Sequence, residues 1–166
     1  GVIRVSGSAA SGQSVVRIDS PNVLGTRTST GTGSVVDMNG GVLAVLMDSP
    51  SVLAGGAAAH VYGRASSTFF ADHTPNSSVK NQTVTFGQLA FEDNITLTFN
   101  SRNGYGMTFA AAPVVGTTAG DNDNTMTNNL QGGALLTFTG NFWSNGNNTA
   151  NRTMTIGGNG NTLISG

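Results

Sequence analysis

The chain has 166 residues, with seven Lys and Arg against eight Asp and Glu, and it contains no cysteine. This near-neutral balance provides no basic surface for nucleic acid or for anionic lipid, so neither partner is expected. The lack of cysteine excludes thiol catalysis and every cysteine-ligated zinc site. Gly, Asn, Thr and Ser together make up nearly half of the chain. This mixture of turn formers and β-branched residues predicts many short strands joined by tight turns, in a single all-β domain over residues 1–166.

Short segments in which apolar residues alternate with polar ones follow one another along the chain. Each predicts a strand with one buried face. The first two are residues 2–5 and 15–18, with Arg4 and Arg17 on the outward side, and a more apolar strand follows at 42–47. The same alternation then recurs with threonine on the outward face, at residues 84–86, 95–99, 107–109, 136–139 and 153–156.

Asn-Gly pairs separate several of these strands and leave two architectures open. They occur at residues 39–40, 103–104, 145–146 and 159–160. Asn-Gly between alternating strands favours hairpins, and therefore an antiparallel β-sandwich. The same residues also provide the left-handed corners of a parallel solenoid. A Thr-x-Thr strand motif recurs at irregular spacing, which stacked strands with variable corners tolerate. We therefore predict a right-handed parallel β-helix with ~20 to 25 residues per turn and about seven turns, and keep the antiparallel sandwich as the alternative.

Three parts of the chain resemble a known family. Residues 31–43 (GTGSVVDMNGGVL) resemble the G-T-G-S-V-x-V-N-G-G-T-L unit of autotransporter passenger domains. Residues 136–141 (LTFTGN) and 162–166 (TLISG) resemble the L-T-L-S-G-N unit of the same autotransporter-associated β-strand repeats. The resemblance implies a β-helix that is exported to the outside of a bacterium, and it leaves the function open.

The search for chemistry gives few candidates. Glu92 and Asp93 are neighbours, and neighbours on a strand point to opposite faces, so they cannot act together on one bond. No nucleophile elbow, metalloprotease motif or phosphate-binding loop occurs, so we expect no enzyme and no cofactor. Asp121 and Asp123 lie in an oxygen-rich segment that resembles a calcium loop, but no bidentate Glu follows. A plain polar loop is favoured there, and calcium is the alternative.

Trp143 is the one candidate for ligand binding. It follows Phe142 and lies among asparagines. An exposed aromatic ring among amides can stack on a sugar. A glycan partner bound in this way gives the alternative function, an adhesin or carbohydrate-binding module.

Both ends of the chain carry strand patterns. Val2, Ile3 and Val5 begin it, and Leu163 and Ile164 close it. A solenoid that starts and stops in a strand exposes unpaired backbone groups, which favours stacking of further copies or continuation within a longer chain. No apolar run approaches the ~18 residues that cross a membrane. We therefore expect a secreted or surface-located bacterial structural protein that forms fibres by self-association, with itself as the main partner.

Overall fold

The computed structural model describes residues 3–7, 14–21, 36–53, 60–115, 123–140, 144–145 and 153–165. Within these residues the regular structure consists of fifteen strands and no helix. In chain order the strands are β1 (Ile3–Ser6), β2 (Val15–Ile18), β3 (Val36–Asn39), β4 (Val42–Leu46), β5 (Ser51–Val52), β6 (Val61–Ala65), β7 (Ser67–Asp72), β8 (Thr83–Phe91), β9 (Thr96–Ser101), β10 (Gly106–Val115), β11 (Asn124–Asn129), β12 (Leu135–Thr139), β13 (Ser144–Asn145), β14 (Met154–Gly157) and β15 (Asn161–Ser165).

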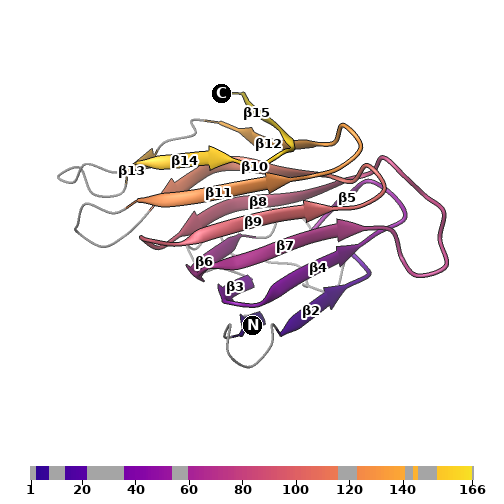
Figure 1. The fold of residues 1–166 in the computed structure, drawn as a ribbon. Helices are drawn as coiled ribbons and strands as arrows, with labels where there is room; N and C mark the ends of the chain where they lie inside the picture. The colour runs from indigo at the N-terminus through magenta and orange to yellow at the C-terminus, as the bar shows by residue number, and fades with distance from the viewer. Residues whose placement is uncertain are drawn as a thin grey trace.

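The strands form two facing sheets in which every pairing is parallel. Sheet A has the order β1-β3-β6-β8-β10-β12-β15, with β5 and β13 paired beside this path, and sheet B has the order β14-β11-β9-β7-β4-β2. The chain alternates between the sheets as it climbs from the N-terminal to the C-terminal end (Figure 1). In Figure 1 the front strands run to the right and the rear strands to the left, which makes the winding right-handed. The predicted parallel β-solenoid is confirmed, and the antiparallel sandwich is wrong.

Many turns of the solenoid are longer than the sequence predicted, although the step from Val84 to Met107 falls within the expected range. Thr96 pairs with Thr125 and Thr125 pairs with Thr155, so one turn takes more than the expected ~20 to 25 residues, and the chain forms fewer than the expected seven or so turns. Some strands of sheet A also span two shorter neighbours. The first part of β8 pairs with β5 and its last part with β6, and β10 likewise pairs with both β12 and β13. A register shift between Ala111 and Val114 separates the two parts of β10.

The hydrophobic core fills the space between the sheets. Because the strands are parallel and in register, the inward side chain of one turn lies directly over that of the turn before. Phe86, Phe109 and Phe138 form one such column, with ring centroids 5.0 and 5.4 Å apart. Phe69 and Phe99 form a second column from sheet B, stacked at 5.0 Å, and meet the first edge to face. Aromatic rings favour both arrangements.

The Asn-Gly pairs at residues 39–40, 103–104 and 159–160 form corners of the solenoid and not hairpins, and the pair at 145–146 lies partly outside the described residues. Gly40 and Gly41 both have positive φ and connect β3 of sheet A to β4 of sheet B. Asn103 and Gly104 do the same between β9 and β10, with φ values of 54° and 76°. Residues that tolerate the left-handed conformation let the chain change direction while the strands stay parallel.

Candidate functional site: the two ends of the solenoid

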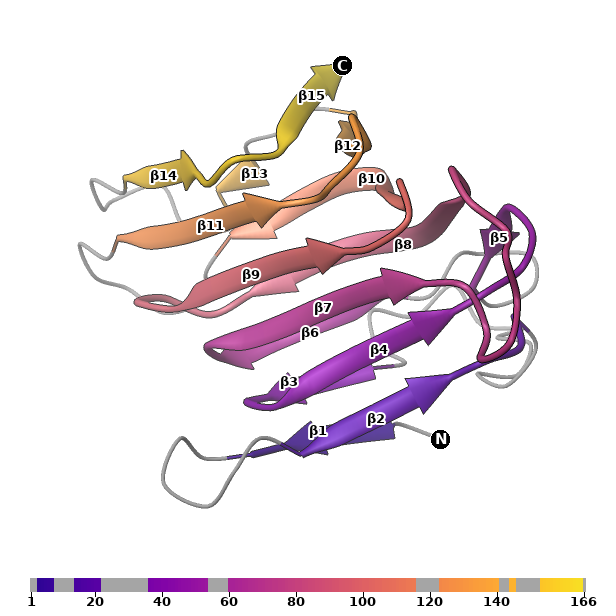
Figure 2. The ribbon, with the colours of Figure 1, turned by 45° about the vertical axis from the view of Figure 1, so that its right-hand side comes forward.

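The N-terminal end is closed over its core. In the part of the chain that the structure describes, β1 pairs only with β3 and β2 only with β4. Val5 and Ile18 point inward and are buried, and Ile3 is half-buried. Of the residues predicted at this end, Ile3 and Val5 therefore offer a partner mainly their backbone, and Val2 lies outside the described residues. Figure 2 shows β1 and β2 at the lower edge of the two sheets.

The C-terminal end differs, because its core is exposed. Among the described strands, β15 pairs only with β12 and β14 only with β11. Ile164 stands over Phe138 in the register and continues the phenylalanine column, yet 47% of it is exposed. Leu163 and Ile156 are 44% and 37% exposed. Ile164 and Ile156 face the core, whereas Leu163 stands over Thr137 on the outer face of sheet A. Figure 2 shows β14 and β15 at the upper edge of the two sheets.

Strands β14 and β15 are short, but they carry no charge or proline that would hinder pairing with a further strand. Natural edge strands are blunted by charged side chains, by proline or by bulges. The sequences of β14 and β15 are MTIG and NTLIS, with no charge and no proline. In a parallel ladder, alternate residues direct both N–H and C=O to the same side. Within the described residues, the upper edges of both strands therefore present donors and acceptors for a further strand beside exposed apolar side chains.

A buried asparagine fixes the position of the last strand. Asn128 occupies the place above Phe99 in the sheet B register and is fully buried. Its Nδ2 donates to the carbonyl oxygen of Asn161 and to Oγ1 of Thr162, both at 2.9 Å, and its Oδ1 accepts from the N–H of Leu130 at 3.0 Å. Buried amides are stable when their groups are satisfied in this way. Asn128 therefore holds β15 in position, a role that the sequence did not reveal because the residue continues an otherwise apolar alternation.

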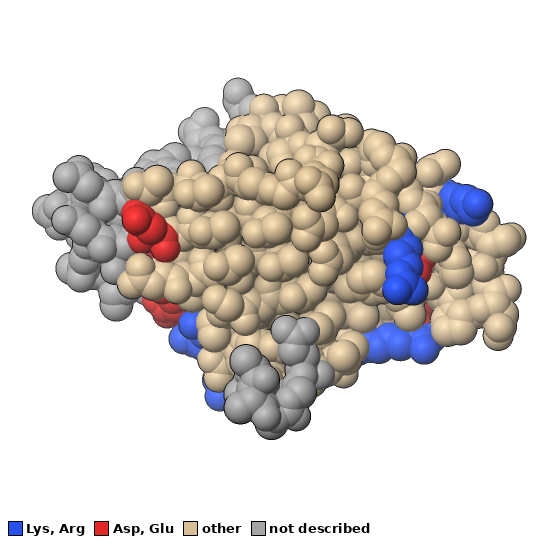
Figure 3. Space-filling model, in the orientation of Figure 1, with Lys and Arg blue, Asp and Glu red and all other residues tan. Residues whose placement is uncertain are grey.

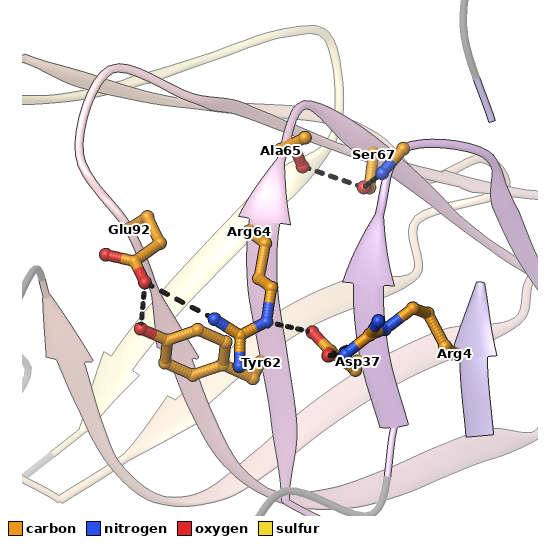
Figure 4. A network of polar contacts seen from close by, with 8 residues as sticks. Arg4, Asp37, Tyr62, Arg64, Ala65, Ser67 and Glu92 are labelled. Atoms are coloured by element: carbon orange, nitrogen blue, oxygen red, sulfur yellow. Dashed lines mark hydrogen bonds and ion pairs between the residues drawn. The ribbon is translucent and has the colours of Figure 1, made fainter. Parts of the chain in front are cut away.

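A ladder of alternating charges runs up the outer face of sheet A from the N-terminal edge (Figure 4). Asp37 on β3 is buried and accepts from Arg4 on β1 through Oδ2, at 3.2 and 3.1 Å. Its Oδ1 accepts from Nε of Arg64 on β6 at 2.7 Å. Nη1 of Arg64 lies 3.7 Å from Oε1 of Glu92, which also accepts a hydrogen bond from Tyr62. One charged side chain per turn thus ties four successive turns together.

The electrostatics of the ladder follow from this geometry. The hydrogen bond to Asp37 raises the pKa of the Arg64 guanidinium above its usual value. The guanidinium also lies 4.6 Å from the centroid of the Tyr62 ring, a cation–π contact. With each charge facing its opposite, the ladder fixes the register of β1, β3 and β6. No sequence signal revealed it, because its members lie in different turns of the solenoid and share no motif.

The other predicted site residues are distributed as follows. Asp123 accepts a hydrogen bond from the N–H of Thr153 at 3.2 Å and so links two turns. Asp121 and Trp143 lie outside the described residues, and the calcium and glycan predictions stay predictions. Residues 3–7, 14–21, 36–53, 60–115, 123–140, 144–145 and 153–165 contain no group of three His, Asp or Glu side chains that could hold a metal.

Comparison with known proteins gives no family for this chain. No family model, no curated protein and no solved structure matches it. The resemblance to autotransporter repeats therefore stays a prediction. Within the described residues no helix is long and apolar enough to cross a membrane.

Proposed function

We propose that the protein is an extracellular structural element of a bacterial surface or fibre, which assembles by end-to-end stacking of solenoids. One observation carries this proposal: in the described part of the chain, the last turn exposes Ile156, Leu163 and Ile164 beside two unpaired strand edges. Covering this apolar surface and pairing these backbone groups would both stabilise an added turn. A secreted or surface location accords with the cysteine-free composition and with the autotransporter-like segments.

The two ends carry strands that can continue each other. β15 belongs to sheet A and β14 to sheet B, as β1 and β2 do at the opposite end. If β1 of a second copy pairs with β15, sheet A continues without a break. Sheet A has seven strands on its path and sheet B six, so the β2 of the second copy lies two strand spacings from β14, and one place in sheet B is left for a further strand. Such a contact joins different surfaces of two copies, and a contact of this kind produces a filament unless the rotation closes a ring. Because the core at the N-terminal end is already buried, most of the apolar surface covered by the contact belongs to the C-terminal end.

A charge placed on the exposed core tests the proposal. We expect sedimentation velocity and negative-stain micrographs of the purified chain to show rods that lengthen with protein concentration. Ile164→Lys should abolish this growth, because a lysine at the joint would lose its hydration. Leu135→Lys is the matched control, since Leu135 is 44% exposed on β12, one turn below the end strand, and should leave assembly unchanged.

Three results would contradict the proposal. The first is a chain that stays monomeric at every concentration while it is folded. The second is equal growth of the Ile164→Lys variant and the parent chain, with both showing the same circular dichroism and unfolding midpoint. An association that is lost in both lysine variants would also count against end stacking, because Leu135 does not lie at the joint.

A further inference from the structure

The outer face of sheet B is regular and lacks charge over its centre. None of its pairings has a register shift, whereas sheet A has shifts in β6 and β10. Strands β7, β9, β11 and β14 lie side by side across this face (Figure 1). In Figure 3, which views the same face, the charged side chains lie near its margins and the centre is uncharged. The face is therefore a surface of neutral groups on an ordered backbone.

Hydroxyl groups form two parallel columns on this face. In one column Thr96, Thr125 and Thr155 pair in successive turns. In the other, two residues further along each strand, Thr68 pairs with Thr98 and Thr98 with Thr127. All except Thr155 are half-buried between their neighbours. We call these six residues, Thr68, Thr96, Thr98, Thr125, Thr127 and Thr155, the threonine array.

The side chains of the array are stiff and evenly spaced. Threonine is β-branched, so its χ1 angle is restricted and its hydroxyl and methyl groups are held in place. Neighbouring turns are ~4.8 Å apart, and residues i and i+2 of a strand are ~6.6 Å apart. A third column, two residues further along β9 and β11, contains the amides of Asn100 and Asn129. There Nδ2 of Asn129 donates to Oδ1 of Asn100 at 3.2 Å. The face thus holds polar atoms on a nearly rectangular grid.

This grid resembles the spacing of water molecules in ice. Water oxygens that hydrogen-bond directly are ~2.75 Å apart, so in a tetrahedral lattice two waters that share a neighbour are ~4.5 Å apart. The same geometry gives a repeat of ~7.3 Å along the perpendicular axis of the hexagonal lattice. Along the stack, the ~4.8 Å between turns exceeds the ~4.5 Å water spacing by ~0.3 Å per turn. Across the columns, the ~6.6 Å between threonines differs from the ~7.3 Å lattice repeat by less than ~1 Å. Over an array of this size the two grids stay within about 1 Å of each other.

We propose that the threonine array binds ice, with ordered water as its ligand. The hydroxyls would bond to waters at lattice positions, while the methyl groups restrict the waters that lie between the columns. The lack of charge at the centre matters, because an ion would orient water around itself and disrupt the lattice. This activity is independent of end stacking, since the array lies on the side of the solenoid.

The test measures growth of ice in the presence of the purified chain. The parent chain should inhibit recrystallisation in a frozen solution at micromolar concentration, and its fluorescently labelled form should bind a single ice crystal. Thr98→Tyr projects a ring from the centre of the array and should raise the concentration needed by at least about tenfold. Thr98→Val keeps the shape without the hydroxyl and should weaken inhibition by less. This second variant also covers the case in which the tyrosine disturbs folding.

Thr108→Tyr is the matched control. Thr108 is a half-buried threonine on β10, in a single column with Thr85 and Thr137 on the outer face of sheet A. The Thr108→Tyr variant should inhibit ice recrystallisation as strongly as the parent chain does. A parent chain no more active than an inert protein would overturn the proposal, and so would equal loss in the two tyrosine variants. Binding to insoluble polysaccharide without binding to ice would also overturn it, and would assign the face to glycans.

Discussion

Replacement of Phe109 by leucine tests whether stacked aromatic rings stabilise the core. Phe109 is fully buried, and its ring contacts Phe69, Phe86, Phe99 and Phe138 with centroids 5.0 to 6.0 Å apart. Each aromatic pair contributes ~0.5 kcal/mol or more beyond the area buried, so four pairs account for about 2 kcal/mol. The smaller leucine side chain adds about 1 kcal/mol for lost packing. We expect Phe109→Leu to lower the free energy of unfolding by about 3 kcal/mol.

Phe91→Leu provides the comparison. Phe91 is equally buried at 1% exposure on β8, and no aromatic ring pairs with it among the described residues. Its replacement should therefore cost only the packing contribution, about 1 kcal/mol. Urea unfolding followed by circular dichroism measures the loss of unfolding free energy in both variants. The comparison requires that the slope of this free energy with urea concentration is the same in each. Equal losses in the two variants would refute the assignment of stability to ring stacking.

Three further predictions concern polar residues and a corner. Asp37→Asn should destabilise the chain by about 1 to 2 kcal/mol, because two arginines lose a buried charged acceptor. Asp19→Asn, at an exposed ion pair, should lower the free energy of unfolding by under ~0.5 kcal/mol. Urea titration measures both variants. Gly158→Ala should lower the free energy of unfolding by more than ~2 kcal/mol, since φ is 101° and the new Cβ would lie 2.1 Å from a backbone oxygen. The control Gly157→Ala should be nearly neutral, because its new Cβ meets nothing within 4 Å. Equal melting temperatures of the two variants would contradict this prediction. Hydrogen bonds from a threonine side chain and backbone lower the pKa of Asp48 below 3.8. Its contribution to stability is therefore present above about pH 4 and lost as the pH falls through the folded-state value, so Asp48→Asn should flatten the acid limb of the stability profile.

The sequence was sufficient to predict the parallel architecture and many of the strands, but β6, β7 and β11 were not predicted. Alternation at residues 95–99 and 107–109 matches β9 and the start of β10, with Leu97 and Phe109 buried as expected. The irregular recurrence of Thr-x-Thr strands favoured parallel stacking, and all pairings are parallel. The length of many turns was underestimated, and pattern alone does not show that β8 and β10 each span two neighbouring strands of sheet A.

The features that distinguish the two ends could not be predicted from the sequence. Val5 and Ile164 occupy similar positions in their alternating patterns, yet one is buried and the other 47% exposed. Exposure at an end depends on what covers the last turn, which is a property of tertiary structure. The burial of Asp37 and Asn128 was missed for the same reason: each is satisfied by partners from the neighbouring turn, far away along the chain. The register that brings these partners together becomes known only from the fold.

Cryo-electron microscopy of the assembled chain tests most directly whether the solenoid continues from one molecule to the next. If copies stack end to end, reconstructions should show the strands of sheet A spaced ~4.8 Å apart without interruption across the joint, with β15 of one copy beside β1 of the following one. Copies that contact each other through the outer faces of their sheets, with the C-terminal turn left exposed to solvent, would contradict this assembly.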